Sequence, residues 1–131
     1  GIPMPGPARA GLFVYAKDKD RLCRFYAEVA GMKKLNETAE LTVLESGDIQ
    51  LLVHNIPASI AATITITTPP ARREDTALKF FFTVSSLEQA RAKATALGGA
   101  IWNENWRGPG FVVCNGMDPE GNVFQVREIA A

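Results

Sequence analysis

The sequence runs through the same order of predicted elements twice, and this repeat constrains the fold more than any single motif. Each half begins with an apolar strand, continues with a capped amphipathic helix and ends with three short strands. The helix caps, Asp18 and Ser86, are 68 residues apart, and the same shift relates the strand starts, Gly11 and Lys79. We therefore predict an α+β fold of two tandem βαβββ modules in one domain. The predicted bounds are residues 1–131 for the domain, about 8–54 and 78–128 for the modules, and about 55–77 for the connector.

In the first half, one helical face is marked by apolar side chains. Asp18 precedes the helix as a good N-cap, and Gly31 follows its end. The apolar positions between them have the spacing of one helical face; they are Leu22, Phe25, Tyr26 and Val29. Strands are predicted at residues 11–16, 32–36, 41–45 and 48–54.

The second half repeats this pattern after a connector rich in Pro, Thr and Ala. Ser86 caps the helix, and Gln89 three residues later is typical of a capping box. Its predicted apolar face consists of Leu87, Ala90, Ala94 and Leu97. Strands are predicted at residues 78–84, 100–102, 111–114 and 123–127. In the connector we expect a helical turn at residues 60–62 and a short extended piece at Ile64 and Ile66.

The stretch MDPEGNVFQVRE, at residues 117–128, combines a tight turn with an alternating strand. Pro119 presets its backbone for the turn, and Gly121 tolerates a positive φ. Together with the pattern of Asp18, the Phe25–Tyr26 pair and Gly31, this ending resembles the vicinal-oxygen-chelate superfamily. That superfamily contains glyoxalase I, extradiol dioxygenases and bleomycin-resistance proteins. The resemblance implies two modules whose sheets curl into a cup, with the helices on the outer surface.

The resemblance also implies where a metal ion would bind. The four corresponding positions are Gly11, Gln50, Lys79 and Gln125, and in the metalloenzymes a carboxylate stands in place of Gln125. Glycine offers no side chain, a protonated lysine repels a cation, and two neutral amides are poor ligands for Zn²⁺, Fe²⁺ or Ni²⁺. We therefore expect no metal and no other cofactor.

Strand alternation then predicts which side chains face the cup. Leu12 and Val14 should pack under the helices, whereas Phe13 and Tyr15 face the opposite way. Trp106 is expected in a glycine-rich loop over the mouth, and Trp102 in the core. The predicted ligand-binding residues are Phe13, Tyr15, Gln50, Leu52, His54, Lys79, Phe81, Trp106, Gln125 and Arg127.

Aromatic walls with a few polar anchors suit an amphipathic or aromatic small molecule, whose carboxylate or phenolate could pair with Lys79. The main hypothesis is thus a small-molecule binding protein of the bleomycin-resistance type with a degenerate metal site. One alternative is a divalent-metal lyase of the glyoxalase type, or a dioxygenase, using Gln50, Gln125 and a carboxylate such as Glu104. Another is a non-catalytic interaction or regulatory module. The sequence leaves open whether the chain is an enzyme.

Composition narrows the choice of partners. Fourteen Lys and Arg residues balance fourteen Asp and Glu residues, so no net charge favours nucleic acid. No apolar run approaches the roughly 20 residues that span a bilayer. Residues 1–10 lack the features of a signal peptide, and Cys23 and Cys114 suit buried thiols, so we expect a cytoplasmic protein. By resemblance and by the frequency of twofold symmetry, we expect a homodimer.

Overall fold

The computed structural model describes residues 8–130, which form two mixed four-stranded sheets. The first module contains β1 (Gly11–Ala16), α1 (Lys19–Val29), β2 (Lys33–Glu37), β3 (Leu41–Glu45) and β4 (Gln50–Asn55), in the sheet order β1-β4-β3-β2. The second contains β5 (Phe80–Val84), α3 (Leu87–Ala96), β6 (Ala100–Gly108), β7 (Phe111–Met117) and β8 (Val123–Ile129), in the sheet order β5-β8-β7-β6. The predicted α+β fold of two βαβββ modules is confirmed.

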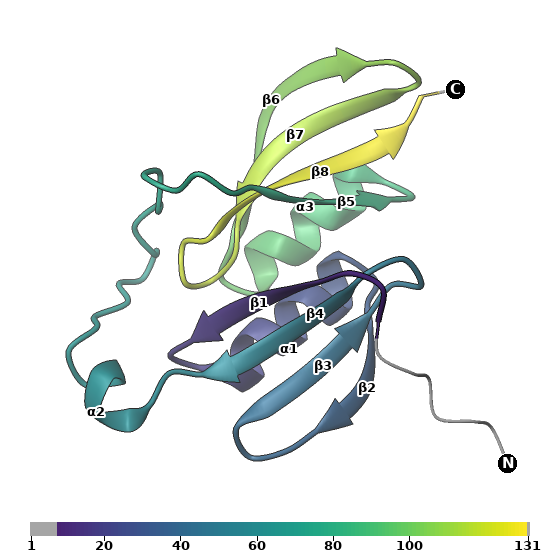
Figure 1. Ribbon diagram of the computed structural model, residues 1–131. Helices are drawn as coiled ribbons and strands as arrows, with labels where there is room; N and C mark the ends of the chain where they lie inside the picture. The colour runs from purple at the N-terminus through teal and green to yellow at the C-terminus, as the bar shows by residue number, and fades with distance from the viewer. Residues whose placement is uncertain (1–7, 131) are drawn as a thin grey trace, which may run out of the picture.

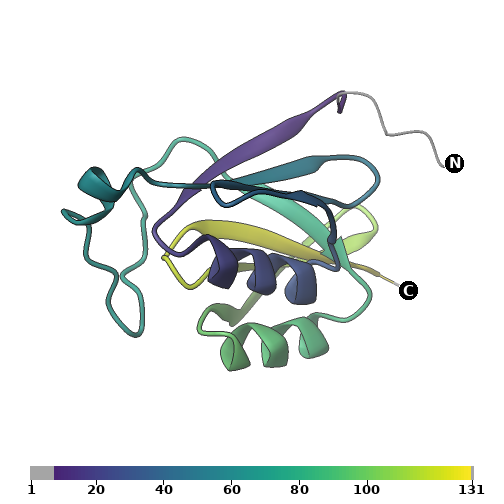
Figure 2. The ribbon, with the colours of Figure 1, turned by 90° about the horizontal axis from the view of Figure 1, so that it is seen from below.

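Both long helices lie on the same side of the two sheets. Figure 1 shows α1 and α3 behind the strands, and Figure 2 shows them with parallel axes, α3 below α1 and the strands of the first module above both. The connector, which contains α2 (Ala58–Ala61), runs along one edge from the first module to the second. The opposite face of each sheet carries no helix among residues 8–130, and we call it the uncovered face.

The apolar side chains predicted to lie beneath the helices form the core. On α1, Leu22 and Phe25 are completely buried, and on β4 the alternation places Leu51 and Val53 inside. Gln50, Leu52 and His54 lie on the other face of β4 and are half-buried. Both predicted caps are present: Asp18 accepts from Arg21 N, and Ser86 accepts from Gln89 N.

Strand register places the predicted cup residues in rows on the uncovered face. β1 pairs in parallel with β4, which sets Phe13 opposite Leu52 and Tyr15 opposite His54. β5 pairs in the same way with β8, which sets Phe81 opposite Gln125. Directly paired residues point to the same side of a sheet, so the face predicted for these side chains is confirmed.

The turn at residues 118–122 joins the two modules through buried carboxylates. Asp118 is fully buried and accepts a hydrogen bond of 2.7 Å from the hydroxyl of Tyr26, on the helix of the other module. It also accepts from the backbone N–H groups of Glu120 and Asn122 and from the Asn122 amide. The Glu120 carboxylate accepts from the backbone N–H groups of Lys17 and Asp18, at 2.9 and 2.8 Å. Three of these six hydrogen bonds order the turn itself, and the other three tie it to α1 and the residues just before it.

The second module differs from the prediction in β6, which reaches Gly108 instead of ending at residue 102. The prediction that Trp106 lies in a glycine-rich loop is therefore wrong, because pairing with Val113 of β7 keeps it in the strand. The predicted helical turn of the connector is present as α2, one to two residues early, but no strand forms at Ile64 or Ile66.

Residues 1–7, most of the segment considered for a signal peptide, lie outside the described residues. Within residues 8–130, no helix has the length and apolar character needed to cross a bilayer.

Removing the Tyr26 hydroxyl tests the link between the modules. Tyr26→Phe should lower the free energy of unfolding by about 1.5–3 kcal/mol, because a hydrogen bond to a buried carboxylate is lost. Urea denaturation measures this change. The matched control is Tyr15→Phe. Because the Tyr15 side chain is exposed, this substitution should change the free energy of unfolding by less than about 0.5 kcal/mol. Equal effects of the two substitutions would contradict the proposed role of the bond.

Tyr26 also makes the stability sensitive to alkaline pH. Burial first, and then the neighbouring Asp118 carboxylate, raise the pKa of Tyr26 well above its usual value. The folded state holds the Tyr26 proton more tightly than the unfolded state does. The contribution of protonated Tyr26 to the free energy of unfolding is therefore intact below the unfolded pKa of about 10 and is lost as the pH rises further. In Tyr15→Phe, Tyr26 is the only tyrosine. Phenolate absorbance should then appear only together with unfolding by circular dichroism, and a phenolate in the native fold would contradict this.

Candidate functional site

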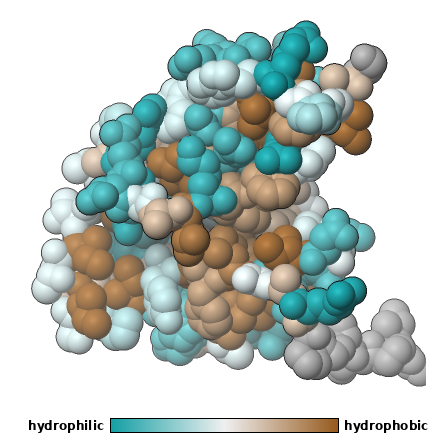
Figure 3. Space-filling model, turned by 45° about the horizontal axis from the view of Figure 1, so that its top comes forward, coloured by the Kyte–Doolittle hydropathy of each residue, from teal (hydrophilic) through white to brown (hydrophobic). Residues whose placement is uncertain are grey.

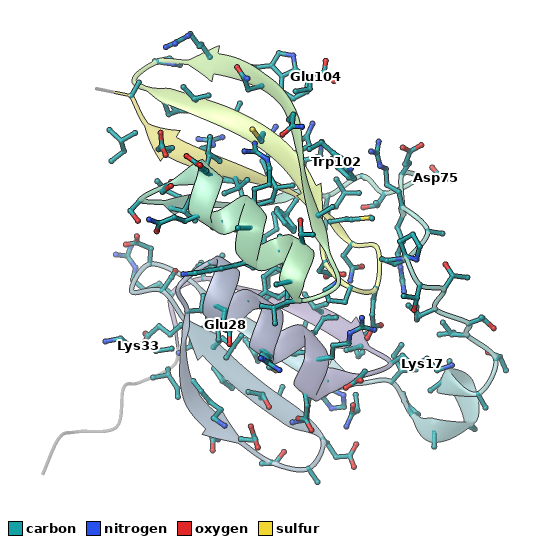
Figure 4. All side chains as sticks on the ribbon, turned by 180° about the vertical axis from the view of Figure 1, so that it is seen from behind. Lys17, Glu28, Lys33, Asp75, Trp102 and Glu104 are labelled. Atoms are coloured by element: carbon teal, nitrogen blue, oxygen red, sulfur yellow. The ribbon has the colours of Figure 1, made fainter. Side chains whose placement is uncertain are left out.

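A cavity of about 320 Å³ lies between the uncovered face of the second module and the connector. We call it the tryptophan pocket. Its walls from the sheet are Lys79, Trp102, Glu104, Trp106, Asn115 and Val123, and the connector closes it with residues between 72 and 78. Figure 4 shows Trp102 and Glu104 on the strand next to the connector segment that carries Asp75.

Trp102 contributes a wall of this pocket instead of filling the core, so its predicted position is wrong. Ile101 occupies the core position in β6, and alternation turns the next side chain to the uncovered face. There Trp102 is half-buried, and the guanidinium carbon of Arg72 lies 3.7 Å from the centre of its ring. Glu74 holds Arg72 in turn through an ion pair of 2.9 Å.

The connector is fixed in place by the same turn that joins the modules. Arg73 donates its backbone N–H to the carbonyl of Gly121 at 2.9 Å, and its Nε to the carbonyl of Glu120 at 3.1 Å. The pocket wall is therefore attached to the turn that precedes β8. The sequence analysis assigned no structure to residues 72–76, so it missed Arg72, Arg73 and the contact of Arg72 with Trp102.

The pocket carries three cations against two carboxylates, which are Glu74 and Glu104. Arg72 is already paired with Glu74. Within the described chain, Arg73 and Lys79 have no carboxylate at ion-pair distance. The Lys79 ammonium makes one long contact of 3.5 Å with the side-chain oxygen of Asn115. An anionic group entering this pocket would meet two unpaired cations.

A second cavity, of about 460 Å³, lies where the two modules meet. Phe13 and Tyr15 of β1 line it together with Phe80 of β5. Its connector wall includes Arg73, Thr76 and Leu78, which also line the tryptophan pocket, so the connector separates the two cavities. Figure 3 shows hydrophobic surface gathered on this side of the molecule, between the modules.

The other predicted ligand-binding residues line neither cavity. His54 lies against Tyr15 and Phe13, with ring centres 5.9 and 6.4 Å apart, and its Nδ1 is 2.7 Å from the carbonyl oxygen of Asn55. Arg127 lies over the ring of Phe81 at 3.9 Å. The remaining three, Gln50, Leu52 and Gln125, are half-buried on the uncovered face. The structure thus divides the predicted site into separate groups instead of one continuous lining.

The four positions implied for a metal are not arranged in the same way in the two modules. Gln50 pairs with Gly11, whereas Gln125 pairs with Phe81, and Lys79 precedes the first residue of β5. Among the residues that the structure describes, no three His, Cys, Asp or Glu side chains come together as a metal site. The donors present do not fit a divalent transition metal, which prefers imidazole, thiolate or carboxylate ligands.

The cysteines do not change this conclusion. Cys23 and Cys114 are both free and buried. Burial raises the pKa of the Cys23 thiol, which disfavours the thiolate that a metal or an electrophile would need.

Comparison with known proteins agrees with this architecture. The protein family described as a glyoxalase-like domain matches residues 11–127. A comparison with curated proteins finds no match.

Solved structures with the same fold include a glyoxalase/bleomycin resistance protein/dioxygenase family enzyme from Burkholderia phytofirmans. It is 16% identical, with 95% of this chain and 100% of that chain covered and a TM-score of 0.68. A glyoxalase/bleomycin resistance protein from Albidiferax ferrireducens is 16% identical, with coverage of 92% and 98% and a TM-score of 0.64. The fosfomycin resistance protein FosX from Listeria monocytogenes is 12% identical, with coverage of 92% and 90% and a TM-score of 0.64.

At these identities the solved structures show a shared fold and nothing about a shared ligand. The family match spans both modules and nearly the whole described chain. The chain therefore belongs to the glyoxalase-like domain family.

Proposed function

We propose that this protein binds a small amphipathic or aromatic molecule with an anionic group in the tryptophan pocket, without a metal ion. The observation that carries the proposal is the convergence of Trp102, Trp106 and Lys79 on one cavity. Its volume of about 320 Å³ falls at the lower end of the range of roughly 300–1,000 Å³ found for small-molecule sites.

Each part of the pocket has a distinct role in this proposal. The indole ring of Trp106, which is 46% exposed, offers flat apolar surface for a planar ligand, whereas Arg72 covers one face of Trp102. Lys79 and Arg73 offer positive charge to a carboxylate or phenolate, and the amide of Asn115 can fix its orientation. The connector, attached through Arg73, keeps these groups in place before a ligand arrives.

A metal-dependent lyase or dioxygenase is less well supported. Glu104 does line the tryptophan pocket, but Gln50 and Gln125 do not. The three side chains of that alternative are therefore not gathered in one cavity. The interaction module and the homodimer stay predictions; Phe13, Tyr15 and Phe81, each more than half exposed on the uncovered face, would suit either. The cytoplasmic location also stays a prediction.

Fluorescence titration with small aromatic carboxylates tests the pocket. Binding should change the tryptophan emission, and Trp106→Phe should diminish the change. Lys79→Met should weaken binding about tenfold or more, because a charge-assisted contact is lost. The control is Lys33→Met, an exposed lysine on β2 of the other module (Figure 4). Equal affinity in the two lysine variants would remove Lys79 from the site.

Elemental analysis and chelation test the metal-free character. Protein purified without a metal-affinity step should contain far less than one equivalent of Zn, Ni, Mn or Fe, because the donor set does not fit these ions. A strong chelator should leave ligand affinity unchanged. A stoichiometric metal that disappears in the double variant Gln50→Ala, Gln125→Ala would contradict the proposal and support the metal-dependent alternative.

A further inference from the structure

Arg127 lies on the uncovered face of the second module, clamped between two phenyl rings. Its guanidinium carbon is 3.9 Å from the ring centre of Phe81 and 4.4 Å from that of Phe111. Register places it opposite Thr83 of β5 and Val113 of β7, away from the core side chain Val126. The side chain is thus held in one orientation by its neighbours.

The nitrogen Nε of Arg127 lacks a hydrogen-bond acceptor. Within residues 8–130 it is the sole buried side-chain nitrogen or oxygen without a partner. Buried polar groups in folded proteins are almost always paired, so such an exception requires an explanation. Aromatic faces attract the charge of the guanidinium, but they leave its N–H donors unsatisfied.

The charge of Arg127 is also unbalanced. No carboxylate within the described chain lies at ion-pair distance from it. The next residue, Glu128, points to the helix side, where it accepts from the backbone N–H of Leu87 at 2.8 Å. The guanidinium of Arg127 is thus unpaired and has a fixed plane, and such a group matches a planar or tetrahedral oxyanion through paired hydrogen bonds.

We propose that Arg127 forms a second anion-binding site, which takes the carboxylate or phosphate group of a small molecule. Arg127 is four residues beyond Val123 of the tryptophan pocket, a separation of about 13 Å along a strand. Arg127 itself does not line the tryptophan pocket. The site therefore goes beyond the proposed function and does not depend on it. Phe81 is 53% exposed beside the guanidinium, so an aromatic carboxylate should bind more tightly than inorganic phosphate.

The Nε–H group itself reports on this site by NMR. Its resonance, assigned by its disappearance in Arg127→Lys, should shift and saturate as sodium benzoate is added at constant ionic strength. The same shift should persist in Lys79→Met, which disables only the tryptophan pocket. Inorganic phosphate is titrated separately and should bind more weakly than benzoate. A response to phosphate alone would contradict an organic carboxylate as the ligand. No saturable shift with either, or one that chloride reproduces, would overturn the proposal.

Substitutions separate binding from structure. Arg127→Met keeps an unbranched side chain between the rings and removes the unpaired nitrogen, so its thermal stability should equal or exceed that of the parent protein. Affinity is compared in a background that lacks the tryptophan-pocket lysine. There, the double variant Lys79→Met, Arg127→Met should bind benzoate about tenfold or more weakly than Lys79→Met. Arg24→Met, at an exposed position of α1, is the matched control and should change neither quantity. A large loss of stability with unchanged benzoate affinity would show a purely structural role and overturn the proposal.

A second variant covers the case in which Arg127→Met does not fold. Arg127→Lys keeps the positive charge but loses the planar fork, so benzoate affinity at this site should again fall about tenfold. Affinity equal to that of the parent protein would overturn the proposal.

Discussion

The rest of the structure depends on two buried carboxylates in the turn between β7 and β8. Asp118 accepts from Tyr26, and Glu120 accepts from the backbone at the start of α1, so a turn of the second module holds the helix of the first. Burial raises the pKa of the Asp118 carboxyl, while its hydrogen bonds, led by the one from Tyr26, oppose that rise. Removing any donor leaves this buried group less well compensated, so the link holds the modules in one arrangement.

That arrangement decides which surfaces are available for ligands. With α1 and α3 packed together on one side, the other faces of both sheets have no helical cover among the described residues. The connector crosses part of this side because Arg73 is bonded to the carbonyls of Glu120 and Gly121. One turn therefore orders both the joint between the modules and a wall of the tryptophan pocket.

The uncovered side has different chemistry on its two halves. The first module presents the aromatic group of Phe13, Tyr15 and His54, whereas the second presents Lys79 and Arg127 beside aromatic rings. Cations without carboxylate partners, next to flat apolar surfaces, suit organic anions better than metal ions. The family match accounts for the fold, and the proposed binding of organic anions rests on these side chains.

Local patterns in the sequence were enough to predict the helices, their caps, the repeat and the face of each cup residue, because these depend on spacing and on nearest neighbours along the chain. The turn at residues 118–122 was also recognisable, through Pro119 and Gly121. Three features were not predictable: the extension of β6 through Trp106, the outward position of Trp102, and the contact of Arg72 with its ring. Each depends on groups far apart in the sequence, namely pairing with β7 or the path of the connector. The sequence by itself determined the fold and the side of the sheet on which the candidate residues other than Trp106 lie. Only the tertiary structure decided which of them share a cavity, because that depends on how the connector and the two modules meet in space.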